Sequence, residues 1–214
     1  MNRGIDMKEK LSLLFKIIIA IISGIGLYLN FNLLSFKDSI IYFTIQSNLL
    51  CFIYFLGLVV LTITKKLKKT DLYYISKGMI TMAITTTLIV YWFVLVPEGG
   101  IEAYIGHNLE NNFVHLFTPL LVIFDYIIFG EKGHLKKNYP FIWSFVLIAY
   151  VIFNIVYVLL GGRFSNNTCY PYPCMNIDNL GLFRVCVNCL VIYVCFIGCG
   201  ILIQKLDNKI ITKI

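Results

Sequence analysis

The chain has 214 residues, of which 59% are hydrophobic and 14% are charged, with a mean hydropathy of +0.82 and a formal net charge of +7. An average soluble domain has about a quarter charged residues, so this composition excludes a typical soluble protein and indicates a membrane protein. The basic surplus does not indicate a nucleic-acid partner, because the basic residues lie between and beyond the apolar stretches instead of on one face.

Six apolar stretches predict six transmembrane helices, at residues 12–34, 40–63, 76–96, 112–129, 141–160 and 180–203. Each is close to the roughly 20 residues that cross a hydrocarbon core. Helices satisfy their own backbone groups in lipid, and no stretch alternates like a barrel strand. The sequence has no visible repeat and no long linker. We therefore predict an all-α membrane protein with one integral membrane domain, residues 1–214, folded as a six-helix bundle.

The first stretch follows Arg3, Lys8 and Lys10, as the apolar part of a signal peptide would. It is too long for that assignment and lacks a small-x-small cleavage site, so we expect a retained helix.

The placement of lysine and arginine predicts the orientation of the bundle. If the N-terminus is cytoplasmic, fifteen of these residues fall on inner segments, and only Lys37 and Arg163 fall on outer ones. Such an imbalance over short loops follows the positive-inside rule. We therefore predict a multi-pass protein of the cell membrane with both termini in the cytoplasm.

The second span opens with polar side chains that recur at helical spacing. One face would carry positions i, i+3, i+4 and i+7, which are Thr44, Ser47, Asn48 and Cys51. If the helix begins at Asp38 or Ser39, Thr44 lies about 8 Å below the outer surface. Polar side chains in lipid raise the free energy of the protein unless they have hydrogen-bond partners, and those that persist often have a functional role. For Thr44 alone, the ordinary interpretation is a packing threonine that bonds its own helix.

The fourth span carries a second polar face, which consists of His115, Thr118, Val122 and Asp125. Asn111 or Asn112 can cap this helix, which places His115 about one turn in, at a depth similar to that of Thr44. Pro119 has no N–H and frees the His115 carbonyl, so the sequence predicts a kink.

Asp125 lies near the cytoplasmic end of the fourth span. It is either a functional intramembrane acid or the partner of a lysine. We favour an ion pair with Lys132 or another inner lysine.

Arg184 and two cysteines stand out near the outer end of the sixth span. Arg184 requires an anion, such as Asp178, a lipid headgroup or a substrate carboxylate. Cys169 and Cys174 flank a Tyr-Pro-Tyr-Pro segment on the outer side, where a disulfide can persist. Their spacing does not fix the closing geometry, so the bridge stays an open alternative.

The third loop contains Glu98, Glu102, His107 and Glu110 without a basic residue. A cation site is one interpretation, and we favour an ordinary solvated acidic loop. We predict no metal and no cofactor.

In this order, Tyr42-Phe43-Thr44-Ile45-Gln46-Ser47-Asn48, His115-x-x-x-Pro119 with Asp125, Tyr170-Pro171-Tyr172-Pro173 and Gly181-x-x-Arg184 resemble the androgen-induced gene family. That family consists of multi-span membrane proteins with bacterial six-span relatives. Its animal members are intramembrane threonine hydrolases that cleave fatty acid esters of hydroxy fatty acids. The resemblance implies a catalytic threonine at Thr44 and a catalytic histidine at His115, and it points to a bacterial plasma membrane.

These residue types suit ester hydrolysis in lipid. A threonine hydroxyl becomes a nucleophile when a base accepts its proton, and histidine is the usual base near neutral pH. Ser47 or Asn48 would donate to the oxyanion, and Arg184 would hold a substrate carboxylate. The expected partner is a membrane lipid or a lipid-like ester. The alternative is a non-enzymatic six-helix protein with a lipid-binding, scaffold or transport role.

Overall fold

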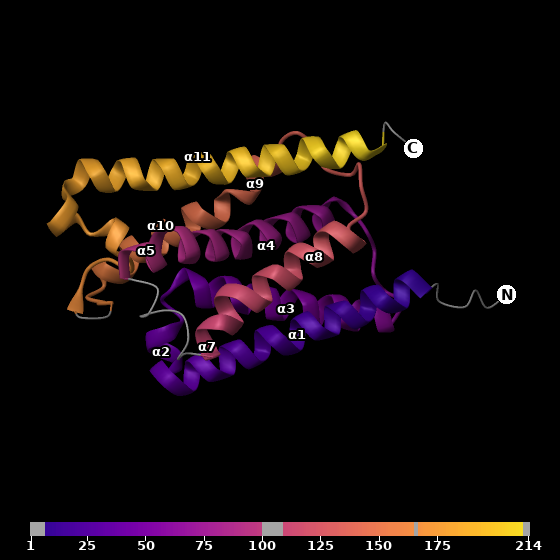
Figure 1. Cartoon of the computed structure of the whole chain (residues 1–214), viewed down its shortest axis with the longest axis horizontal. Coiled ribbons are helices and arrows are strands. Elements are labelled where there is room, and N and C mark those ends of the chain that lie inside the picture. The colour runs from indigo at the N-terminus through magenta and orange to yellow at the C-terminus, as the bar shows by residue number, and fades with distance from the viewer. Residues whose placement is uncertain (1–6, 100–108, 165–166, 212–214) are drawn as a thin grey trace.

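The computed structural model describes residues 7–99, 109–164 and 167–211. Within these residues the chain is helical and has no strand. Six helices are long and apolar enough to cross a membrane: Met7–Leu34, Phe43–Ile63, Asp71–Leu95, Leu109–Phe129, Tyr139–Leu159 and Ile177–Lys209. This confirms the predicted six-helix membrane fold. The helices lie roughly side by side, and both ends of the chain lie at one end of the bundle (Figure 1).

Several of these spans are built from more than one element. The first two are α1 (Met7–Leu34) and α3 (Phe43–Ile63), joined by the short α2 (Phe36–Ser39). The third combines α4 (Asp71–Val90) with a π-helical segment, η1 (Tyr91–Leu95), and continues into α5 (Val96–Gly99). The fourth combines α7 (Leu109–Asn112), a second π-helical segment, η2 (Phe113–Phe117), and α8 (Thr118–Phe129).

The last two spans are irregular as well. The fifth consists of α9 (Tyr139–Trp143) and α10 (Phe145–Leu159), which meet at Ser144. A loop with one 3₁₀ turn, η4 (Pro173–Met175), leads to α11 (Ile177–Ile211). Gly181 interrupts α11 with a φ of 73° and a ψ of 155°. A positive φ of this kind is strained for a residue with a side chain, which explains the glycine there.

The core of the bundle lies between α1, α3, α4 and α8. Its buried side chains are Ile19, Ala20, Cys51, Phe55, Leu58, Ile80, Ile84 and Val122. A second cluster joins α4 to α9 and α11, and Trp143 at its centre is fully buried against Gly78. Helix α11 is the most peripheral of the six spans. Only 11% of its most apolar 18-residue segment is buried inside the protein, whereas the corresponding share for the third span is 44%. Its remaining apolar surface is suited to lipid contact.

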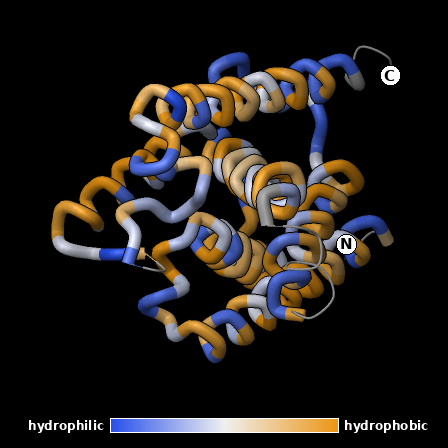
Figure 2. The backbone as a smooth tube through the Cα atoms, turned by 60° about the vertical axis from the view of Figure 1, so that its left-hand side comes forward, coloured by the Kyte–Doolittle hydropathy of each residue, from blue (hydrophilic) through white to orange (hydrophobic). Residues whose placement is uncertain are grey.

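Hydropathy along the chain agrees with a membrane-spanning bundle. Hydrophobic stretches follow the helices, and hydrophilic stretches gather near helix ends and connections (Figure 2). Large exposed side chains such as Phe93, Leu159 and Phe183 would be unfavourable in water and are favourable in lipid.

The start of the second span differs from the prediction. Ser35 caps the separate helix α2 by accepting a hydrogen bond from the Asp38 N–H, and α3 begins only at Phe43. Neither Asp38 nor Ser39 therefore starts the long helix. Thr44 is the second residue of α3, in its first turn, so it lies closer to the helix end than the predicted depth of about 8 Å.

Candidate functional site

The head of α3 lacks an ordinary cap. Tyr42 precedes the helix in an extended conformation, and its side chain makes no capping hydrogen bond. The N–H groups in the first turn of a helix have no intrahelical acceptor. Here the Phe43 N–H donates to the hydroxyl of Tyr172, 129 residues further along the chain, at 3.1 Å. Thr44 follows directly and is half-buried.

Ser47 and Asn48 hold the backbone around Thr44. The Ser47 hydroxyl lies 3.0 Å from the Thr44 carbonyl oxygen and 2.8 Å from the Thr87 hydroxyl of α4. The Asn48 amide nitrogen donates to the Thr44 carbonyl at 2.8 Å and to the Val114 carbonyl at 3.0 Å. Asn48 therefore ties Thr44 to the residue that precedes His115. Both side chains already have partners, whereas the sequence suggested them as oxyanion donors.

His115 lies in the π-helical segment η2. The Thr118 N–H donates to the Phe113 carbonyl, five residues back, which is the π-helical pattern. Pro119 explains this register, because it cannot donate to the His115 carbonyl four residues earlier. The predicted irregularity before Pro119 therefore takes the form of a π-helical turn. Such turns are often found at functional sites.

A matching π-helical turn lies opposite, in η1. The Val96 N–H donates to the Tyr91 carbonyl, and Pro97 follows. The rings of Tyr91 and His115 stack, with centroids 3.7 Å apart and an angle of 13° between their planes. His115 is 8% exposed, and its Nδ1 has no hydrogen-bond partner among the described residues. A buried ring nitrogen without a partner is available to a ligand or to a proton.

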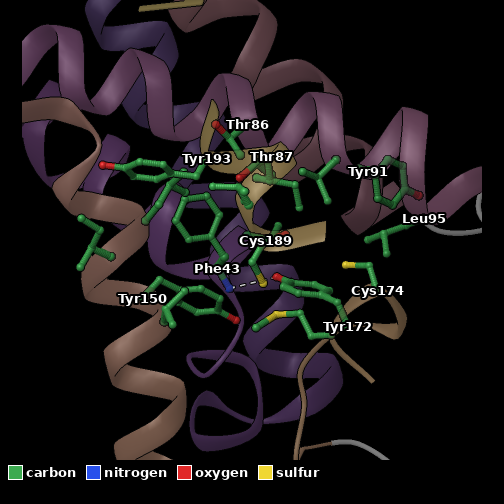
Figure 3. A pocket seen from close by; sticks show the side chains of 18 of the residues that line it. Phe43, Thr86, Thr87, Tyr91, Leu95, Tyr150, Tyr172, Cys174, Cys189 and Tyr193 are labelled. Carbon is green, nitrogen blue, oxygen red and sulfur yellow. Dashed lines mark hydrogen bonds between the residues drawn. The ribbon is translucent and has the colours of Figure 1, made fainter. Parts of the chain in front are cut away.

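Thr44 and His115 line one pocket, with a volume of about 460 Å³. This is within the range of about 300–1,000 Å³ for small-molecule sites. Its walls come from α3, α4, η1, η2, α10, α11 and the loop around η4, and Figure 3 shows the pocket from close by. The lining is mostly apolar. Its side-chain hydroxyls belong to Thr44, Thr86, Thr87, Tyr91, Tyr150, Tyr172 and Tyr193.

Tyr172 and Tyr150 were not predicted as site residues. Figure 3 shows the Tyr172 hydroxyl directed at the Phe43 nitrogen. Tyr172 also packs against Tyr150, whose hydroxyl donates to the Ile41 carbonyl at 3.2 Å. The sequence offered only a weak signal, a tyrosine between two prolines in one of the segments that carry the family resemblance.

Of the remaining predicted residues, Cys174 lines the pocket, whereas Arg184 and Cys169 do not. Arg184 and Asp178 are exposed, and Arg184 does not line the pocket. Cys169 and Cys174 are present as thiols, and the first is exposed while the second is buried in the pocket wall. Within residues 7–99, 109–164 and 167–211, no three His, Cys, Asp or Glu side chains gather as metal ligands would. Glu98, Glu102 and His107 have side chains outside the described part of the chain.

Asp125 belongs to a separate buried cluster. It is 0% exposed and lies 2.8 Å from the Lys77 Nζ and 3.6 Å from the Lys16 Nζ. An ion pair with an inner lysine was predicted, with Lys132 as the named candidate. Lys132 instead donates to the Tyr126 carbonyl at 3.3 Å and lies over the Tyr126 ring.

Comparison of the chain with protein-family models, with curated proteins and with solved structures finds no match.

Proposed function

We propose that the protein is an intramembrane hydrolase of lipid or fatty-acyl esters, with Thr44 as nucleophile and His115 as general base. The observation that carries this proposal is the shared pocket of Thr44 and His115. Asn48 supports it, because one amide nitrogen holds the backbone of Thr44 beside that of Val114. Mutual placement of nucleophile and base is the first requirement for such chemistry.

The proposed reaction has two balanced steps. Thr44 Oγ attacks the ester carbonyl carbon and passes its proton to His115, and the leaving alcohol then takes that proton as its bond to the acyl group breaks. A water molecule attacks the acyl-threonine and gives a proton to His115. The bond to Thr44 breaks, the carboxylic acid leaves, and the proton returns to Thr44.

The pocket wall supports an acyl substrate that comes from the membrane. Ile148, Ile152 and Leu190 line the pocket and are 37%, 55% and 60% exposed, on α10 and α11. In a bilayer these side chains face lipid tails. An acyl chain can therefore extend between α10 and α11 while the ester lies near Thr44.

Replacement of Thr44 tests the proposal. Thr44→Val keeps the shape and removes the hydroxyl, so we expect hydrolysis of a long-chain ester and labelling by a fluorophosphonate probe to fall to background, while Thr44→Ser keeps part of both. His115→Gln should lower the rate by about 10²- to 10⁴-fold. The matched control is Thr86→Val, because Thr86 lines the same pocket but donates to the Met82 carbonyl of its own helix at 2.9 Å.

Two outcomes would contradict the hydrolase. One is full activity in Thr44→Val, and the other is a correctly inserted wild-type protein that neither hydrolyses esters nor reacts with the probe. The second result would favour the non-enzymatic alternative, in which the same pocket binds a lipid without cleaving it.

A further inference from the structure

The wall of the pocket that Thr44 and His115 share is uncharged. Among the described residues that line it there is no aspartate, glutamate, lysine or arginine. Its titratable side chains are His115, four tyrosines and three cysteines. Tyrosine and cysteine side chains are ordinarily neutral near pH 7. The charge of the wall therefore depends on the protonation of His115 alone.

The surroundings of His115 favour its neutral form. Its ring is 8% exposed and stacks on the ring of Tyr91. A protonated imidazole would be a buried cation, and no acidic side chain among the described lining residues can pair with it. The Nδ1 atom has no hydrogen-bond partner within the described part of the chain. A neutral imidazole with an unsatisfied ring nitrogen thus lines the pocket, which indicates a ligand there.

Several hydroxyl groups of the wall already have partners within the protein. Thr86 donates to a carbonyl of its own helix at 2.9 Å, and Tyr150 donates to the Ile41 carbonyl at 3.2 Å. The Thr87 hydroxyl lies 2.8 Å from that of Ser47. A sugar or polyol headgroup would exchange many hydrogen bonds with water for few in this pocket, which is unfavourable. A single ester group loses much less.

A charge elsewhere in the bundle has the partners that this pocket lacks. The carboxylate of Asp125 is 0% exposed and lies 2.8 Å from the Lys77 Nζ and 3.6 Å from the Lys16 Nζ. The sequence suggested Arg184 as the partner of a substrate carboxylate, but Arg184 is exposed and does not line the pocket. A ligand carboxylate or phosphate would therefore lie there without a cation among the described lining residues.

We propose that the pocket takes an uncharged ester of a long-chain acid and an apolar alcohol, and that it excludes charged lipid headgroups and free carboxylates. The inference rests on the proposed function, since it names the class of ester that the site accepts. Such an ester enters from lipid past Ile148, Ile152 and Leu190, the exposed side chains of the wall. After hydrolysis the product acid gives its proton to water, and the resulting carboxylate is disfavoured in the pocket and leaves.

The experiment compares palmitamide with palmitate, which have the same chain length and nearly the same shape and differ in charge. Each competes with a fluorescently labelled fatty amide for the full-length protein in lipid nanodiscs at about pH 9, where a carboxyl group is ionised. Ligand concentrations are measured in the nanodisc lipid. Palmitamide should bind at least about tenfold more tightly than palmitate, because a carboxylate has no cation in the wall.

A variant pair tests whether charge causes this preference. Leu95 lines the pocket, so Leu95→Lys places a cation in the wall and should tighten palmitate binding about tenfold, as a charge-assisted hydrogen bond does. Leu95→Met is the matched control, because it is long and flexible but uncharged, and it should bind palmitate as the wild type does.

Equal binding of palmitate and palmitamide by the wild type would overturn the inference, whether or not the variants fold. A folded Leu95→Lys that gains no palmitate affinity over Leu95→Met would overturn it as well. Hydrolysis of methyl palmitate in the same samples separates the two proposals. Hydrolysis without the palmitamide preference removes only this inference. The preference without hydrolysis removes only the enzyme and leaves a pocket that binds uncharged lipids.

Discussion

At the scale of single residues, the buried Asp125 must be neutralised by charges from other helices. Two lysines approach it from two other helices: Lys77 of α4 at 2.8 Å and Lys16 of α1 at 3.6 Å. Lys16 also donates to the Ser12 carbonyl at 3.3 Å and to the Ser12 hydroxyl. Burial of charge in a low-dielectric interior is unfavourable unless each charge is paired. Lys77 is therefore the principal partner of Asp125, and Lys16 the auxiliary one.

Substitution of the two lysines should show this difference. We expect Lys77→Met to destabilise the protein by about 3–5 kcal/mol, because it leaves a buried carboxylate with only the more distant cation. Lys16→Met should cost less than half as much, since the close ion pair remains. Thermal unfolding in one detergent measures both. Equal losses, or a larger loss in Lys16→Met, would show that the assignment of partners is wrong.

The cluster around Asp125 shows which parts of a site can be predicted from the sequence: the residues that share a helix face, but not their partners on other helices. Helical spacing placed His115, Thr118 and Asp125 on one face, and all three are buried. Spacing does not tell which helix packs against that face, so Lys132 was named instead of Lys77. Tyr172 was missed as a site residue for the same reason, because its contact with Phe43 spans 129 residues. Contacts between distant segments depend on packing, which periodicity does not encode.

At the scale of elements, a glycine allows two helices to pack closely at one contact. A Cβ atom added to Gly78 of α4 would lie 2.2 Å from the Trp143 ring of α9, and Trp143 is fully buried. The absence of a side chain at Gly78 thus allows α9 to pack against α4. The sequence predicted both helices, but it contained no signal for this contact.

Gly78→Ala should therefore destabilise the protein by about 1–3 kcal/mol through overpacking. Gly57→Ala is the matched control, because Gly57 also lies inside a membrane helix and a Cβ there meets no atom within 4 Å. Alanine has the higher helix propensity, so this control should be neutral or stabilising by up to about 1 kcal/mol. Thermal unfolding compares the two, and equal effects would exclude the close contact as the cause.

At the scale of the whole molecule, hydrogen bonds join α11 to the rest of the bundle at both of its ends. Near the chain termini, Asp207 accepts from the Gly133 N–H at 2.7 Å, and Gln204 and Asn208 donate to the Leu135 carbonyl at 3.2 and 3.3 Å. At the pocket end, α11 is tied by Asn188 to Cys174 and by the 3.2 Å contact of Tyr193 with Ser144. The pocket thus forms at the end of α11 that packs against the η4 loop, away from the hydrogen bonds near the chain termini.

The fold and the charge pattern together give a prediction for the orientation of this pocket. Both termini lie at the end of the bundle opposite α2, α5 and α7 (Figure 1), and the positive-inside rule predicts that the terminal end is cytoplasmic. Cys169 is exposed in the loop before η4, at the pocket end. A membrane-impermeant maleimide should therefore label Cys169 in intact spheroplasts. The cysteines on α11 lie within a membrane-spanning helix, two of them (Cys186 and Cys189) in the pocket wall, and apolar surroundings disfavour the reactive thiolate.

Two variants allow the labelling experiment to determine which end of the bundle faces the outside. Cys169→Ser should remove the label, which assigns it to that residue. In the Cys169→Ser background, Lys69→Cys places a thiol in the loop between α3 and α4, and we expect it to react only after the membrane is permeabilised. Labelling of this Lys69→Cys variant in intact spheroplasts, together with no labelling of Cys169 in the intact wild type, would indicate the inverted orientation. The pocket would then open toward the cytoplasmic leaflet, and the proposed ester substrate would have to come from there.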